Sequence, residues 1–159
     1  MARSPDGRFG RVAVPYSRTR AMGWISLEGL ARSFTPYSVR VDLSKHELTV
    51  FELSRAILHF PAATGAPSSP TPKGQFFVSD RLPVYLGSPF GSFAFAISGI
   101  QPNLPPGWSG SGDQLAIHGT NDPASIGRSV SAGCVRVSEP ALAKLETILR
   151  LGTPIVIVA

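Results

Sequence analysis

The pattern of apolar and polar residues along the chain is dominated by alternation, which is typical of strands with one buried face. Residues 39–43 and 48–53 alternate on either side of a polar turn at 44–46, and this predicts a β-hairpin. Residues 1–22 show little periodicity and are expected to be irregular, with one short strand following at 23–27. Further strands are predicted at 56–63, 75–79, 92–98, 114–118 and 154–158.

One segment has the periodicity of an α-helix. It begins after Ser138, a good N-cap, with Pro140 in the first turn, and Gly152 ends it. Its apolar residues share one face: Leu142, Leu145, Ile148 and Leu149. The helix is therefore expected at about 139–150. Many short strands with a single helix indicate a mostly-β fold, a sandwich or a barrel.

Two loops rich in proline and glycine, at 66–74 and 101–112, interrupt the strands, because proline fixes φ and removes a backbone donor. Tyr85, Phe90 and Trp108 lie in or near such segments. We interpret these aromatic side chains either as packing against the core and loops or as lining a groove for a peptide.

The composition fits one folded domain, with 159 residues, 43% apolar and 16% charged. No apolar run approaches the roughly 20 residues that cross a bilayer, so no membrane segment is expected. Residues 1–10 are basic and polar with no apolar region behind them, and we expect no export signal in this chain.

The net charge of +5 is concentrated at one end, because residues 1–40 carry seven Arg against Asp6 and Glu28. Residues 41–159 carry eight basic and eight acidic side chains, so the rest of the chain is neutral. We interpret the basic segment as a solvated tail, and no nucleic-acid partner is expected. Residues 38–159 are expected to form the folded domain. Residues 1–37 are interpreted as a basic arm outside it, with the tail of a truncated preceding β-module as the alternative.

The single cysteine, Cys134, excludes an internal disulfide and a cysteine-based metal cluster. A lone thiol is either buried packing or a reactive group. His118 lies 134 − 118 = 16 residues earlier, at the end of a predicted strand. An imidazole that takes the thiol proton creates a nucleophile, so His118 is a candidate base.

Neighbouring residues suit the same chemistry. Gly133 permits a tight turn, and its amide with that of Cys134 could face a substrate carbonyl as an oxyanion hole. The carbonyl of Gly119 could hold the second imidazole nitrogen, since no carboxylate is evident nearby. Ser131 is expected to support the turn. Arg136 is interpreted either as a binder of a substrate carboxylate or as a structural hydrogen-bond donor. No metal and no organic cofactor are required.

At this point the chain resembles a known family. The segments His118-Gly119-Thr120 and Ser131-x-Gly133-Cys134-x-Arg136 are similar to the signature of the L,D-transpeptidase catalytic domain (YkuD) family. Flanking pieces occur in the family's order: 41–44, 48–50, 64–65, 71–74 and 152–154. The resemblance covers about residues 38–159. One position departs from it, since Ala132 stands where the family usually has a second histidine.

The resemblance implies a β-sandwich-like catalytic domain whose cysteine attacks peptidoglycan stem peptides. The nucleophile would be Cys134 and the base His118, with the Gly119 carbonyl assisting. A thioester would form with release of D-Ala, and an amine would resolve it to give a 3→3 cross-link or another amide. The site would lie outside the membrane, and carbapenem-type β-lactams would acylate it. Alternatives are a carboxypeptidase or endopeptidase using water, or a non-catalytic wall-binding module.

Overall fold

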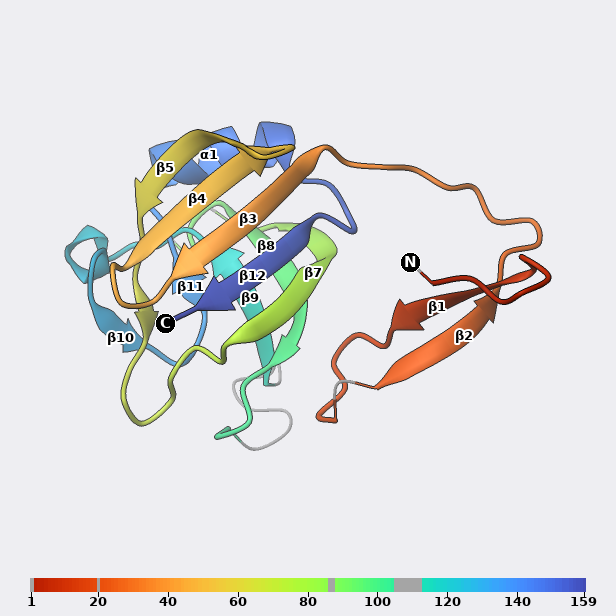
Figure 1. Ribbon diagram of the computed structural model, residues 1–159. Helices are drawn as coiled ribbons and strands as arrows, with labels where there is room; N and C mark the ends of the chain where they lie inside the picture. Colours follow the sequence, from red (N-terminus) through yellow and green to blue (C-terminus); the bar gives the residue numbers. More distant parts are fainter. Residues whose placement is uncertain (1, 20, 86–87, 105–112) are drawn as a thin grey trace.

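The computed structural model describes residues 2–19, 21–85, 88–104 and 113–159 (Figure 1). Its strands are β1 (Phe9–Ala13), β2 (Met22–Ser26), β3 (Tyr37–Asp42), β4 (Glu47–Glu52), β5 (Arg55–Pro61), β6 (Thr64–Gly65), β7 (Gly74–Pro83), β8 (Phe93–Ile100), β9 (Gln114–His118), β10 (Ser129–Ser131), β11 (Val135–Arg136) and β12 (Pro154–Val158). A 3-10 helix spans Pro123–Ser125, and α1 spans Glu139–Ile148. The expectation of a mostly-β fold with a helix near 139–150 is confirmed.

Eight strands form one sheet in the order β11-β9-β8-β7-β12-β3-β4-β5. The pairs are antiparallel except β12 with β3 and β11 with β9, which are parallel. The last strand of the chain thus lies in the middle of the sheet, between β3 and β7. β6 and β10 pair separately next to the β11 end.

The core lies between this sheet and α1, which Figure 1 shows behind β3, β4 and β5. Ser138 caps the helix, because its side chain accepts a hydrogen bond from the amide of Ala141. The buried helix residues Leu142 and Leu145 pack with alternate residues of the strands. Those strand residues include Val39, Val41, Leu48, Val50, Phe95, Ile97, Leu115, Ile117, Ile155 and Ile157.

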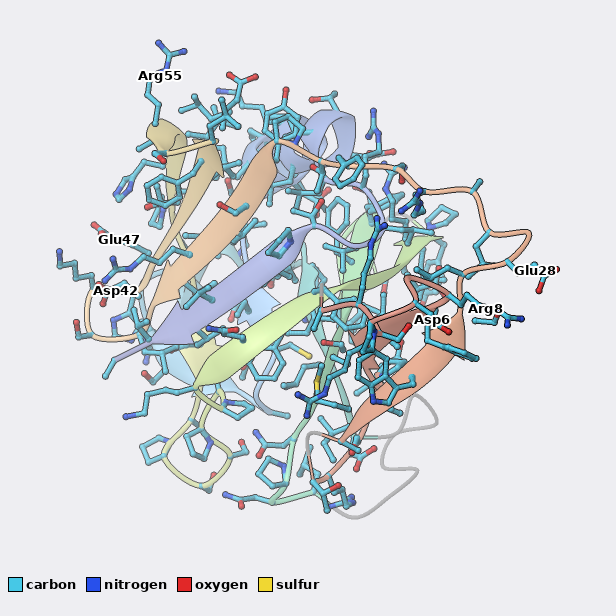
Figure 2. All side chains as sticks on the ribbon, turned by 45° about the vertical axis from the view of Figure 1, so that its right-hand side comes forward. Asp6, Arg8, Glu28, Asp42, Glu47 and Arg55 are labelled. Carbon is cyan, nitrogen blue, oxygen red and sulfur yellow. The ribbon has the colours of Figure 1, made fainter. Side chains whose placement is uncertain are left out.

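The N-terminal residues form a hairpin of β1 and β2 beside the main sheet (Figure 1). The expectation of irregular structure over residues 1–22 is therefore wrong for β1, whereas the short strand at 23–27 corresponds to β2. The apolar residues of β1, Phe9, Val12 and Ala13, do not alternate with polar ones, which explains the error. The charged side chains Asp6, Arg8 and Glu28 are exposed on this hairpin (Figure 2).

Tyr16 attaches the hairpin to the main sheet. Its amide donates to Ser98 O at 2.9 Å, and its hydroxyl lies 2.8 Å from Ser79 Oγ. Arg18 forms an ion pair with Asp113, next to β9. None of the described helices is long and apolar enough to cross a membrane.

Candidate active site

The parallel pairing of β9 with β11 brings His118 and the Cys134 segment together. Val135 pairs with Ile117, and both face the core, so Arg136 and His118 share the opposite face. Cys134 immediately precedes β11, level with Ala116. Cys134 is two residues before the partner of His118, so the two residues lie diagonally across neighbouring strands.

Residues 131–134 form the tight turn that presents the cysteine. Gly133 has φ +121°, a conformation that other residues rarely adopt. Ser131 Oγ accepts a hydrogen bond from Gly133 N at 3.0 Å and donates one to Cys134 O at 2.6 Å. The Gly133 amide already has a partner within the turn, so an oxyanion role for it remains a prediction that requires this bond to open.

Two buried polar side chains from loops distant in sequence donate hydrogen bonds to the turn at 131–134. Gln101 is 1% exposed, and its Nε2 donates to the carbonyl of Ala132 at 3.4 Å. The same nitrogen lies 3.1 Å from Ser69 O and 2.9 Å from Pro70 O. Thr71 Oγ1 donates to Gly133 O at 2.8 Å and accepts from the amide of Gly65. The loop at 66–74 thus supports the turn directly.

Neither Gln101 nor Thr71 was predicted from the sequence to be part of the site. Both lie in the loops that the sequence predicts at 66–74 and 101–112, where no periodicity indicates which side chains point inward. Their one recognisable signal is chemical: each combines hydrogen-bond donor and acceptor capacity, as a residue that satisfies buried carbonyls and amides requires.

The Cys134 thiol is half-buried and lies against the edge of β9, with Sγ 4.0 Å from Gln114 O. Burial raises the pKa of the thiol, while the backbone amide of Ala116 and the charge of Arg136 act in the opposite direction. The net direction is upward, so the resting form at neutral pH is the thiol rather than the thiolate.

His118 is 2% exposed, and its Nδ1 lies 2.6 Å from Gly119 O. A carbonyl only accepts, so Nδ1 carries the proton and Nε2 of the neutral ring is an acceptor. Burial lowers the pKa of His118 to about 4; the Gly119 carbonyl opposes this shift, and the charge of Arg136 adds to it. At neutral pH the imidazole is therefore uncharged.

The remaining aromatic and charged candidates lie at different distances from this pair. The Phe90 ring contacts His118 edge-to-face, with centroids 5.0 Å apart. Tyr85 is 76% exposed, and Trp108 lies outside the described residues. Arg136 is half-buried, and its Nε has no hydrogen-bond partner among the residues that the structure describes.

The arrangement suits proton transfer and nucleophilic attack by sulfur. A neutral imidazole with an unprotonated Nε2 lies on the same face as a neutral thiol, and a guanidinium lies beside both. Across the described parts of the chain, no three side chains of His, Cys, Asp or Glu gather as metal ligands would.

Comparisons with known proteins identify the family of the chain. The family model of the L,D-transpeptidase catalytic domain (YkuD) matches residues 36–157. The chain is 33% identical over 118 residues to a YkuD protein of Bacillus licheniformis, named as an L,D-transpeptidase. It is 32% identical over 134 residues to the YkuD protein of Bacillus subtilis. These alignments cover 74% and 84% of this chain but 63% and 73% of the two relatives.

Solved structures share the fold. An L,D-transpeptidase from Mycobacterium smegmatis superposes with a TM-score of 0.63 at 22% identity, over 87% of this chain and 66% of that one. An L,D-transpeptidase in complex with imipenem has a TM-score of 0.59 at 24% identity, over 77% of this chain and 59% of that one. The β-sandwich-like expectation for the fold is confirmed by these neighbours.

Proposed function

The chain belongs to the L,D-transpeptidase catalytic domain (YkuD) family, and we propose that it transfers acyl groups of peptidoglycan stem peptides through a thioester on Cys134. One observation carries the proposal. The β9–β11 pairing sets Cys134 and His118 diagonally across neighbouring strands, and the Gly119 carbonyl leaves Nε2 of the imidazole free to accept a proton.

In the acylation step, Sγ of Cys134 attacks the carbonyl carbon between the L-centre of the stem diamino acid and D-Ala. Nε2 of His118 accepts the thiol proton as the C–S bond forms. When the tetrahedral intermediate collapses, the C–N bond breaks and His118 returns the proton to the departing amine of D-Ala. A thioester remains on Cys134.

In the second step, the amine of a neighbouring stem attacks the thioester, His118 takes a proton from it, and the thiol is regenerated. The product is a 3→3 cross-link or another amide. If water replaces the amine, the same residues give carboxypeptidase or endopeptidase activity. The identity of the acceptor therefore decides between transferase and hydrolase.

The directions of the two pKa shifts favour proton transfer during attack over a preformed ion pair. The buried imidazole has a pKa of about 4, and burial raises the pKa of the thiol, so both groups are neutral in the resting site. Charge develops only as sulfur attacks, when substrate amide and oxyanion donors are in place. The backbone amide of Cys134 is the oxyanion donor we propose, joined by Gly133 if its bond to Ser131 opens.

Arg136 is proposed to bind a carboxylate of the stem peptide. Its Nε is buried without a partner among the described residues, and an unpaired buried donor is costly unless a ligand satisfies it. Substrate affinity of Arg136→Ala, measured by calorimetry, tests this: weaker binding with unchanged stability supports it, and unchanged affinity with lowered stability assigns Arg136 to the structure.

Three further proposals follow from the family. Residues 38–159 act as the catalytic unit with residues 1–37 attached to it, and the protein works on the outer side of the membrane, where peptidoglycan lies. Carbapenem-type β-lactams acylate Cys134, by analogy with the relative that was solved with imipenem.

Intact-protein mass after brief incubation with a disaccharide-tetrapeptide tests the central proposal. The wild type should gain the mass of the substrate minus D-Ala, and Cys134→Ala and His118→Gln should gain none. Adding an amine or leaving it out then identifies the acceptor. Absence of the adduct in wild-type protein, with the peptide still bound, would favour a wall-binding module without chemistry.

A further inference from the structure

A turn formed by residues 88–92 covers the imidazole of His118. Ser88 organises it, since Gly91 N donates to Ser88 O at 3.0 Å and Phe90 N lies 3.2 Å from Ser88 Oγ. The Phe90 ring packs edge-to-face on His118, and the Phe90 backbone also contacts the imidazole. The burial that lowers the pKa of His118 therefore depends partly on this turn staying in place.

The carboxylate of Glu139, the first residue of α1, fixes the far end of the turn. Ser92 Oγ donates to Glu139 Oε2 at 2.6 Å, and the Ser92 amide lies 3.3 Å from Oε1. Charge-assisted hydrogen bonds of this kind are about twice as strong as neutral ones. The acidic side chain thus connects α1 to the segment that covers the base.

The same carboxylate lies against the backbone on the other side of His118. A Cβ added to either Gly91 or Gly119 would collide with Glu139 Oε1. A Cβ added at Gly91 would also lie 2.6 Å from the Cα of Gly119. Two glycines and one carboxylate therefore pack together without room for another atom, directly beside the carbonyl that orients the imidazole.

We infer that Glu139 is a positioning residue for His118: its carboxylate holds the 88–92 turn and Gly119 against each other, which fixes both the ring and the carbonyl that selects its tautomer. The inference rests on the proposed function only in naming His118 the base. Glu139 touches neither the substrate nor Cys134 in this scheme, and it acts through Ser92, Gly91 and Gly119.

A purely structural role is the competing explanation, because an acidic residue in the first turn of a helix stabilises that helix. The two roles differ in what they change. Loss of a favourable helix charge lowers stability and leaves His118 unaffected. Loss of the bridge lets the imidazole adopt both tautomers and become solvated, whatever the global stability.

The experiment compares Glu139→Ala and Glu139→Gln with Glu146→Ala, a control on the same helix. Glu146 is exposed. Arg81 and Arg150 donate hydrogen bonds to its backbone carbonyl, which the substitution to alanine keeps. Long-range ¹⁵N–¹H spectra identify the tautomer and pKa of His118, with His118→Gln used for assignment. Thioester formation and thermal unfolding are measured on the same samples.

We expect wild type, Glu146→Ala and Glu139→Gln to show the Nδ1–H tautomer, since the glutamine amide oxygen still accepts from Ser92. Glu139→Ala should show mixed tautomers and a pKa of His118 moved upward. Acylation of Glu139→Ala should be slower by about 10- to 100-fold, because a small misplacement of a catalytic group lowers the rate by about this factor. KM should change much less. Ser92→Ala should give the same change, and the double variant little more.

An unchanged tautomer, pKa and acylation rate in folded Glu139→Ala would overturn the inference, as would changes in Glu146→Ala of equal size. The spectra require no substrate. If the wild type forms no thioester, the proposed function fails, while the tautomer and pKa of His118 still decide whether Glu139 positions the ring.

Discussion

The nucleophile and the base of this site are held in different ways. The turn at 131–134 is fixed mainly by side chains that reach it from other segments, Gln101 and Thr71, together with its own Ser131. His118 instead belongs to a strand, and a backbone carbonyl fixes its ring. Substitutions in other segments can therefore disrupt the turn at 131–134. His118 should be affected mainly by changes in the residues that cover its ring.

Gly133→Ala should produce the largest effect on the nucleophile side. An added Cβ would collide with Gln101 Nε2 and lie 3.2 Å from a methyl group of Leu115, and φ +121° is strained for alanine. Strain and overpacking each cost about 1–3 kcal/mol. We expect at least about 100-fold slower acylation, because the sulfur moves with the turn. Urea unfolding and adduct mass measure the two effects.

Gly127→Ala is the matched control, since Gly127 has φ +84° and no atom within 4 Å of an added Cβ. It should incur only the backbone strain, about 1 kcal/mol or slightly more, and keep its acylation rate. Equal losses in the two variants would mean that the contact with Gln101 does not set the turn.

The pH dependence of stability tests the base side. The folded pKa of His118, about 4, lies below the ordinary value of 6.5, so the folded state disfavours the protonated ring. This contribution to stability is present in full above pH 6.5 and is lost as the pH falls toward 4. The shift corresponds to roughly 3 kcal/mol.

Free energies of unfolding between pH 4 and 7.5 should therefore fall less steeply for His118→Gln than for the wild type. The comparison of two slopes cancels the carboxylates that both proteins share. Equal slopes of unfolding free energy against pH in the two proteins would show that His118 is solvated enough to titrate normally. The imidazole would then not be a buried base.

Gln101→Met should have a moderate effect, again on the nucleophile side. Methionine keeps most of the volume but leaves the carbonyls of Ser69, Pro70 and Ala132 without their donor. Unsatisfied buried groups of this kind cost about 1–3 kcal/mol. Urea unfolding should show that loss, and adduct mass should show slower acylation with the histidine spectra unchanged. A variant as stable and active as the wild type would show that the turn holds itself.

Apart from β1, the sequence predicted the strands of five or more residues and the helix, and it missed the shorter strands. The β3–β4 hairpin, β7, β8, β9, β12 and α1 were predicted because each repeats a period over several residues. β6, β10 and β11 have two or three residues, too few to show any period, yet β11 aligns the site. Their pairing depends on contacts across the fold, which no local pattern contains.

The residues of the candidate site also differ in whether the sequence could predict them. Cys134, His118 and Gly119 could be proposed from residue chemistry and a family resemblance. Gln101, Thr71 and Glu139 could not, because their importance comes from where remote loops and the helix end bring them. Gly133 illustrates both: its need for a positive φ was foreseeable, whereas the engagement of its amide by Ser131 was visible only in three dimensions.

Ala132→His should have the smallest effect and concerns the one position that departs from the family pattern. Ala132 is half-buried within the turn at 131–134, and its carbonyl accepts a hydrogen bond from Gln101. An added imidazolium there would favour the thiolate, which burial now disfavours. Solvent screening limits the gain, so we expect alkylation of Cys134 by iodoacetamide at pH 7 to accelerate only about 3- to 10-fold.

Ala132→Gln supplies a similar polar bulk without a titratable ring and should leave the alkylation rate of Cys134 near that of wild type. Equal acceleration in both variants would mean that added bulk, rather than charge, exposes the sulfur. No acceleration in Ala132→His would mean that the edge of β9, where Sγ meets the Gln114 carbonyl, controls the thiol more strongly than its own turn. Faster alkylation in Ala132→His but not in Ala132→Gln would support a less activated thiol in this chain. That result alone would attribute the low reactivity of Cys134 to the absence of a histidine at position 132.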